Sequence, residues 1–158
     1  MLAAPPTLLG VQGGEAEEEQ LDVEGEVEAL NVALRLVYRS ALQYSLSSAS
    51  MVGIQAQGVA GQLIEFGDLE LADARELVEK IVSLEGAPTT EVAPLRHDVR
   101  VEDALGWLIE TEQEAIEALQ QAIEPPGREG RSEAIEHMLE HMVMRKQRQV
   151  DLLMRARA

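Results

Sequence analysis

Apolar residues recur three and four positions apart along four long stretches of the chain, which is the spacing of a helix with one buried face. The first stretch covers residues 23–50 and the second covers residues 59–84. The third and fourth cover residues 101–123 and 132–155, and Pro125-Pro126-Gly127 separates them. Proline and glycine after a periodic run end a helix. The pattern therefore predicts an all-α protein built from four helices.

Each predicted helix has one inward face. In the second helix, two acidic side chains lie next to that face. Glu70 and Asp73 lie three residues apart there, so both face the same side. Buried carboxylates need a metal, a cation, a proton or water beside them. In the first helix, Arg35 and Arg39 fall on the outward side. The predicted inward positions are Leu30, Leu34, Val37, Ala41 and Tyr44; Leu71, Ala74, Leu77, Val78, Ile81, Val82 and Leu84; Ala104, Leu105, Leu108, Glu112, Ala115, Leu119 and Ile123; and Ile135, Leu139, Met142, Lys146, Gln149 and Leu153.

A connection without helical pattern, APTTEVAPLRHDVR at residues 87–100, joins the second and third helices. At about 3.3 Å per residue its fourteen residues reach about 45 Å, and a helix of about 25 residues is shorter than that at about 1.5 Å per residue. We therefore expect a crossover that makes helices two and three parallel. Residues 1–21 combine prolines, glycines and a run of glutamates, so we expect a disordered acidic tail before a bundle of residues 22–158.

The charge and composition exclude several functions. The formal net charge is −16, with 29 acidic against 13 basic residues, which argues against binding to nucleic acid or to an anionic membrane. The chain has no cysteine, so disulfides and thiol chemistry are excluded. No apolar run is long enough to span a membrane, and the start lacks the basic region of a secretory signal. We therefore expect a cytoplasmic protein.

Short pieces of sequence between Leu30 and Leu153 resemble the bacterioferritins in their order and spacing. The pieces are Leu30-Asn31, Gln43-Tyr44, Glu70, Leu84-Glu85-Gly86-x-Pro88, Val101-Glu102-Asp103, Glu112, and Val150-Asp151 with Leu153. The resemblance implies a ferritin-like four-helix bundle with a long crossover between helices 2 and 3. It also implies a di-iron centre, made of a Glu from each of two helices and Glu-x-x-His from each of the other two.

The resemblance places the ligands of that centre on residues of mixed chemistry. Glu70 and Glu112 match two of the family's carboxylates, and Tyr44 follows the first ligand position by seven residues. The replaced ligand positions are Val37 and Lys146, where the family has Glu, and Asp73 and Gln149, where it has His. The family's haem ligand, a Met directly after the second-helix Glu, corresponds to Leu71, so we predict no haem.

Three arrangements of these residues stay open. Lys146 can satisfy Glu70, Asp73 or Glu112 in a buried ion-pair network. Alternatively, Glu70, Asp73 and Glu112 can hold a single divalent ion together with water. The third arrangement is a working two-iron centre, which requires the fourth helix to be aligned in a different register.

Two histidines on the fourth helix, His137 and His141, lie four residues apart and form the spacing of a chelating pair. Neither has a Glu three residues before it, so the family's Glu-x-x-His motif is absent. We expect both on the surface or between subunits. His97, in the crossover, receives no role.

The resemblance implies an iron-handling or structural role in an iron-storage-type assembly, with a degenerate ferroxidase centre and no ferroxidase catalysis by this chain alone. One alternative is a metal-binding protein or oxidase that keeps iron or another divalent metal on carboxylates. Another is an interaction module without metal, whose acidic tail recruits a basic protein partner. We expect a homo-oligomer, at least a dimer through the first two helices.

Overall fold

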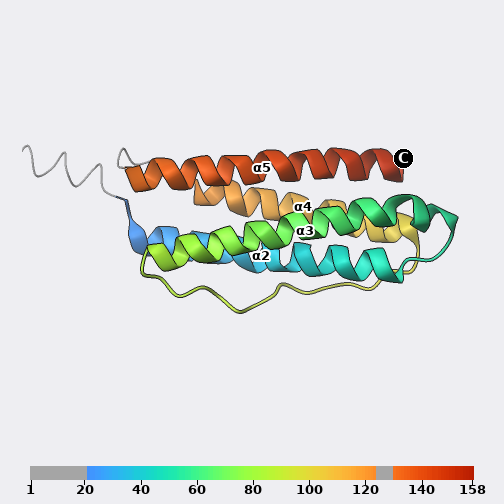
Figure 1. Ribbon diagram of the computed structural model, residues 1–158, viewed down its shortest axis with the longest axis horizontal. Coiled ribbons are helices and arrows are strands. Elements are labelled where there is room, and N and C mark those ends of the chain that lie inside the picture. Colours follow the sequence, from blue (N-terminus) through green and yellow to red (C-terminus); the bar gives the residue numbers. More distant parts are fainter. Residues whose placement is uncertain (1–20, 124–129) are drawn as a thin grey trace, which may run out of the picture.

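The computed structural model describes residues 21–123 and 130–158, which form four long helices lying side by side (Figure 1). The helices are α2 (Val23–Ser50), α3 (Ile54–Ser83), α4 (Val101–Ala122) and α5 (Gly130–Arg157). The described ranges contain no strand, so the predicted all-α class is confirmed. The tail predicted at residues 1–21 lies, apart from Leu21, outside them. No helix within these ranges is long and apolar enough to cross a membrane.

The bounds of three helices differ from the prediction. The range of α2 is as predicted, and Asp22 caps it by accepting a hydrogen bond from the backbone N–H of Gly25 at 3.1 Å. Helix α3 begins five residues earlier, at Ile54 rather than residue 59. Two glycines near its start lower helix propensity, but Ala56 is buried there, so packing outweighs propensity. The ends of α4 and α5 differ by only one or two residues.

The chain direction follows the predicted topology. Figure 1 shows α2 and α3 antiparallel, and then a long segment that returns along the whole bundle before α4 begins. Helix α4 consequently runs parallel to α3, and α5 runs antiparallel to α4 (Figure 1). The long crossover between the second and third helices is confirmed.

Side chains of α2 hold the crossover in place. Asn31 donates to the backbone oxygen of Ala87 at 3.0 Å and accepts from the backbone N–H of Thr89 at 2.8 Å. Gln43 does the same with Arg96, donating to its oxygen at 2.8 Å and accepting from its N–H at 2.9 Å. Because the crossover has no strand neighbour, these amides replace the backbone partners that it would otherwise lack.

Three side chains lie on the opposite side of their helix from the prediction. Arg39, predicted outward, is 4% exposed, and its Nη2 lies 3.0 Å from Glu114 Oε2. Helix α2 packs against α3, α4 and the crossover, so more of its circumference is buried than one stripe. Leu71 and Val82, predicted inward, are 55% and 57% exposed. Helix α3 packs mainly against α2, so its buried face is narrow.

The core has two apolar halves. One contains Leu30, Leu77, Leu119 and Leu139, and the other contains Tyr44, Phe66, Leu105 and Leu153. On every helix a buried polar residue lies between the stretches that belong to the two halves: Ser40 on α2, Glu70 on α3, Glu112 on α4 and Lys146 on α5. A polar layer therefore crosses the middle of the bundle.

A buried ion-pair network at the candidate metal centre

The centre of the polar layer is Lys146, whose side chain has no exposed surface. Its Nζ lies 2.6 Å from Oε2 of Glu70 and 2.9 Å from Oε2 of Glu112. The Oγ of Ser40 lies 3.5 Å away on a third side. An ammonium group has three donors, and these three oxygens from three helices accept them. The four helices thus meet around one protein cation.

The carboxyl groups of Glu70 and Glu112 differ in their hydrogen-bond partners. Both oxygens of Glu112 have a partner, since Lys146 donates to Oε2 and Ser40 donates to Oε1. In Glu70, Lys146 donates to Oε2, but Oε1 has no partner among the described residues. Burial raises the pKa of Glu70 to about 8, although the positive charge of Lys146 lowers it. Burial thus disfavours the ionised form of Glu70, whereas both oxygens of Glu112 accept hydrogen bonds.

The charged state of Lys146 is stable in this environment. Burial lowers the pKa of Lys146, but the nearby carboxylates of Glu112 and Glu70 raise it by more, to about 12. Charge-assisted hydrogen bonds of this kind are roughly twice as strong as neutral ones, and those of Lys146 link α5 to α3 and α4.

Asp73 lies at the edge of this layer and has its own partner. It is 3% exposed and accepts a short hydrogen bond from Nη2 of Arg145, whose side chain is 40% exposed. Burial raises the pKa of Asp73, and Arg145 acts in the opposite direction. The carboxylate is thus oriented toward a half-exposed guanidinium at the rim rather than toward Nζ of Lys146.

The remaining predicted positions are buried as well. Tyr44 donates from its hydroxyl to Oε1 of Gln149 at 3.4 Å, and both side chains lie inside the bundle. Burial, together with the charges of Glu112 and Glu70, raises the pKa of the Tyr44 hydroxyl well above its ordinary value. Val37 is fully buried in the apolar cluster and offers no ligand atom.

This arrangement does not fit a metal ion. The oxygens of Glu70 and Glu112 that would hold a cation point at an ammonium group, which occupies the space and repels a second positive charge. Asp73, the third carboxylate, is paired with Arg145. No group of three His, Asp or Glu side chains in the described parts of the chain is placed to hold a metal.

The histidines lie elsewhere. His137 and His141 are exposed on α5, toward the end that begins the helix, and His97 is exposed in the crossover. None of the three lines the buried layer. His137 and His141 border a groove between α3 and α5.

Two members of the network were not found from the sequence, namely Ser40 and Arg145. Ser40 lies three residues after Val37 and four before Tyr44, so its position on the inward stripe was the available signal. Arg145 precedes Lys146 directly, and Asp73 lies about one turn beyond Glu70 on the antiparallel helix. Arg145 and Lys146 are adjacent basic residues, and they lie opposite two acidic residues one turn apart, so two ion pairs are possible. We predicted only one of them, the pair that involves Lys146.

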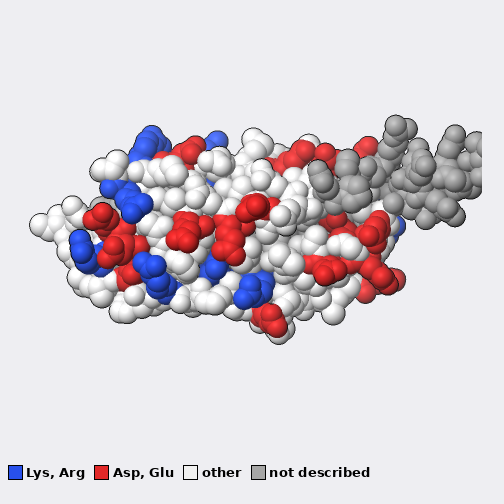
Figure 2. Space-filling view, turned by 180° about the vertical axis from the view of Figure 1, so that it is seen from behind, with Lys and Arg blue, Asp and Glu red and all other residues white. Residues whose placement is uncertain are grey.

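The surface charge is uneven. Figure 2 shows Lys and Arg gathered on the half of the back face where α4 begins and α5 ends, while Asp and Glu also cover the other half. Arg155 and Arg157 in the last turn of α5 belong to that end. Cations at the C-terminal end of a helix complement its dipole, so part of this distribution stabilises α5.

Comparison with known proteins agrees with this architecture. A ferritin-like diiron-carboxylate protein from Bacillus anthracis str. Ames is 25% identical with a TM-score of 0.81, over 88% of this chain and 99% of that chain. The bacterioferritin-related protein from Bacteroides fragilis, a dodecameric thioferritin, is 19% identical with a TM-score of 0.77, over 86% of each chain. A bacterioferritin from Rhodobacter capsulatus, with a metal-free dinuclear site, is 22% identical with a TM-score of 0.68, over 82% and 81%. None of the curated proteins matches the sequence.

The ferritin-like domain family matches residues 27–154, which is most of the chain and includes all four helices except parts of the first and last. The crossover and the polar layer at the middle of the bundle lie within this range. The chain therefore belongs to the ferritin-like domain family.

Proposed function

We propose that this protein is a non-catalytic member of the family, in which the ammonium group of Lys146 takes the place of metal at the centre of the bundle. The observation that carries the proposal is the position of Nζ, 2.6 Å from Glu70 and 2.9 Å from Glu112 with no exposed surface. Family membership supports an iron-handling context. Within it, the role of this chain is structural.

The chemistry of a ferroxidase explains why the side chains present are insufficient. Two iron ions must be held close together through a change of oxidation state, by bridging carboxylates and imidazoles. In this chain the two imidazole positions carry Asp73 and Gln149, and two of the four carboxylate positions carry Val37 and Lys146. One fixed ammonium balances the remaining acids, so the bundle does not need a cation from solution.

The test is iron binding and ferrous oxidation by protein purified without a chelator. The measurements use the wild type and a His137→Gln/His141→Gln variant, so that surface histidines are not counted as a buried site. We expect no iron in the variant and no oxidation above the rate in buffer. A variant with Val37→Glu, Asp73→His, Lys146→Glu and Gln149→His supplies the missing ligands and is the positive control.

Two results would overturn the proposal. About two irons per chain, oxidised by the wild type and lost on Glu70→Gln, would mean that a working di-iron centre forms. One iron per chain, lost on Glu70→Gln or on Asp73→Asn, would replace the proposal by the carboxylate-only metal site.

We also propose that the outer face of α2 and α3 joins two copies of the chain. Leu42, Ile64 and Leu71 are 48%, 54% and 55% exposed around a shallow hollow of about 230 Å³. Exposed apolar groups gathered in one place favour association, and the relative from Bacteroides fragilis is a dodecamer. Light scattering should show a smaller particle for Leu71→Arg and no change for Met144→Arg, whose side chain is 65% exposed on α5. Equal masses for both variants would exclude this face.

A protein partner for the acidic tail stays a prediction.

A further inference from the structure

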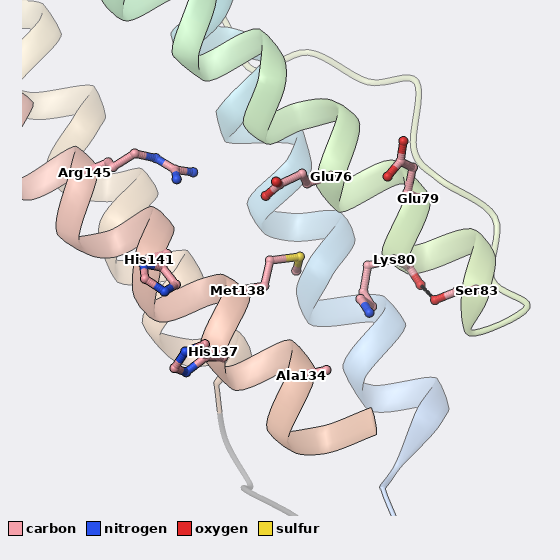
Figure 3. A pocket seen from close by; sticks show the side chains of 9 residues that line it. All are labelled: Glu76, Glu79, Lys80, Ser83, Ala134, His137, Met138, His141 and Arg145. Carbon is pink, nitrogen blue, oxygen red and sulfur yellow. Dashed lines mark hydrogen bonds between the residues drawn. The ribbon is translucent and has the colours of Figure 1, made fainter. Parts of the chain in front are cut away.

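Two imidazoles on α5 lie close together outside the buried network. His137 and His141 are on consecutive turns, their ring centres are 5.0 Å apart, and their ring planes meet at 88°. Both residues are exposed. They border a groove of about 590 Å³ between α3 and α5. Figure 3 shows both rings on α5, with Glu76 and Lys80 on α3 across the groove.

The ring separation suits a shared metal ion. A bound ion lies about 2 Å from each imidazole nitrogen, and therefore about 3 Å from each ring centre. Two rings at neighbouring positions of a tetrahedron then have centres about 5 Å apart. The observed distance between the ring centres is 5.0 Å, so the spacing of the two side chains matches that of a pair bound to one ion.

The surroundings determine which ion can bind. The charged side chains that line the groove are Glu76, Glu79, Lys80 and Arg145, two of each sign, so their charges cancel. No third His, Asp or Glu of the described residues is arranged with the pair as a ligand. Hard cations such as Mg²⁺, which depend on several oxygen ligands, have no site here. Imidazole nitrogen selects the borderline transition metals instead.

We propose that His137 and His141 form a two-imidazole chelate for a divalent transition-metal ion, with water completing the coordination. The expected order of affinity is Cu²⁺ first, then Ni²⁺ and Zn²⁺, then Fe²⁺, because these ligands follow the general stability order of the metals. Neither histidine belongs to the buried network, although Arg145 borders both regions, so the chelate does not depend on the non-catalytic role proposed above.

The test is a titration of the metal-free full chain with Cu²⁺ and with Zn²⁺, followed by calorimetry against a competing chelator. We expect one ion per chain at this site. Replacing either histidine, as His137→Gln or His141→Gln, should weaken binding at least about tenfold, the loss that even an outer-shell partner of a metal can cause. The matched control is His97→Gln, which removes the lone exposed histidine of the crossover and should leave the affinity unchanged.

Electron paramagnetic resonance of the Cu²⁺ complex gives a second measurement. We expect coupling to two imidazole nitrogens in the wild type and to one in either single variant. A Glu70→Gln variant should bind as the wild type does, which separates this site from the buried network. Unchanged affinity in His137→Gln and His141→Gln, or coupling to a single nitrogen in the wild type, would overturn the proposal.

Discussion

Helix α5 carries two polar groups five residues apart that have opposite environments. Lys146 is sealed inside the bundle, and oxygens of Glu70, Glu112 and Ser40 accept its three protons. His141 is exposed at the groove between α3 and α5, with the ring centre of His137 5.0 Å away. Both lie near side chains that can bind metals. The difference shows that the presence of carboxylates in a bundle does not by itself make a metal centre, because a cation of the protein can satisfy them first.

The two regions also differ in what fixes their charge. In the buried layer, burial raises the pKa of Glu70 to about 8, and the charge of Lys146 only partly opposes this. At the groove, water reaches both imidazoles, and charges of both signs line the wall. Substitutions in the buried network should therefore change the free energy of unfolding, whereas substitutions of the two histidines should change metal binding. The following substitutions separate the two.

The largest effect is expected from Lys146→Met. The substitution removes one partner of the buried pair and leaves Glu112 without the ammonium group, which costs roughly 3–5 kcal/mol of unfolding free energy. Denaturant unfolding at pH 7 measures the loss. The double variant Lys146→Met/Glu112→Gln removes the stranded charge as well and should recover most of it. A loss below about 1 kcal/mol in the single variant, small for the removal of one partner of a buried pair, would contradict the network.

The pH dependence of stability tests the protonation of Glu70. Its pKa is about 8 in the folded protein against 4.5 ordinarily, so between these values the folded chain holds one more proton than the unfolded chain. This contribution is full below about pH 4.5 and is lost as the pH rises through about 8, by at most about 1.4 kcal/mol per pH unit. Glu70→Gln removes the titration, so its stability should fall less steeply with pH.

Glu26 must be separated from this effect. Burial, and to a lesser extent Asp22, raises its pKa to about 7, so it also lowers stability as the pH rises. The informative quantity is therefore the difference between wild type and Glu70→Gln at each pH, measured from pH 5 to pH 9. Parallel curves for the two proteins would show that Glu70 is ionised in the folded state at neutral pH.

The sequence predicted the fold better than it predicted the partners. The periodicity placed the four helices, and the length of the connection predicted the crossover. Alignment with the family assigned Glu70, Glu112 and Lys146 to one level of the bundle. Which acid pairs with which cation depends on offsets of a single turn between helices that are far apart in the sequence. Periodicity does not contain that information, so the pairing of Asp73 with Arg145 was missed.

The same limit explains the error at Arg39. A charged residue opposite the main stripe of α2 is normally solvated, and the sequence favours that interpretation. In the structure its guanidinium is buried next to Trp107, 5.9 Å from the ring centre, and is paired with Glu114. The crossover and α4 cover this side of α2 together. Neither segment is close to Arg39 in the sequence, so its burial is a property of the assembled fold.

A smaller effect is expected from Arg145→Gln at the rim. The buried carboxylate of Asp73 loses its charged partner, which costs about 1–3 kcal/mol. Water reaches this position, because the Arg145 side chain is 40% exposed, so the loss should be smaller than for Lys146→Met. Burial already raises the pKa of Asp73, and removal of Arg145 raises it further, so the loss should grow as the pH rises. Adding Asp73→Asn should remove that pH dependence. A loss independent of pH would place Asp73 outside the buried layer.

The smallest effect on stability is expected from the double variant His137→Gln/His141→Gln. Both side chains are exposed, so without metal the unfolding free energy should stay within about 0.5 kcal/mol of the wild type. Adding Zn²⁺ should raise the Tm of the wild type, because an ion that binds only the folded chain stabilises it by mass action. The variant should show no such rise, whereas Lys146→Met should keep it, since the chelate lies outside the network. If Zn²⁺ raises the Tm of the variant as much as that of the wild type, the metal binds elsewhere. The contrast between the buried Lys146 and a metal-binding histidine pair on the same helix would then no longer hold.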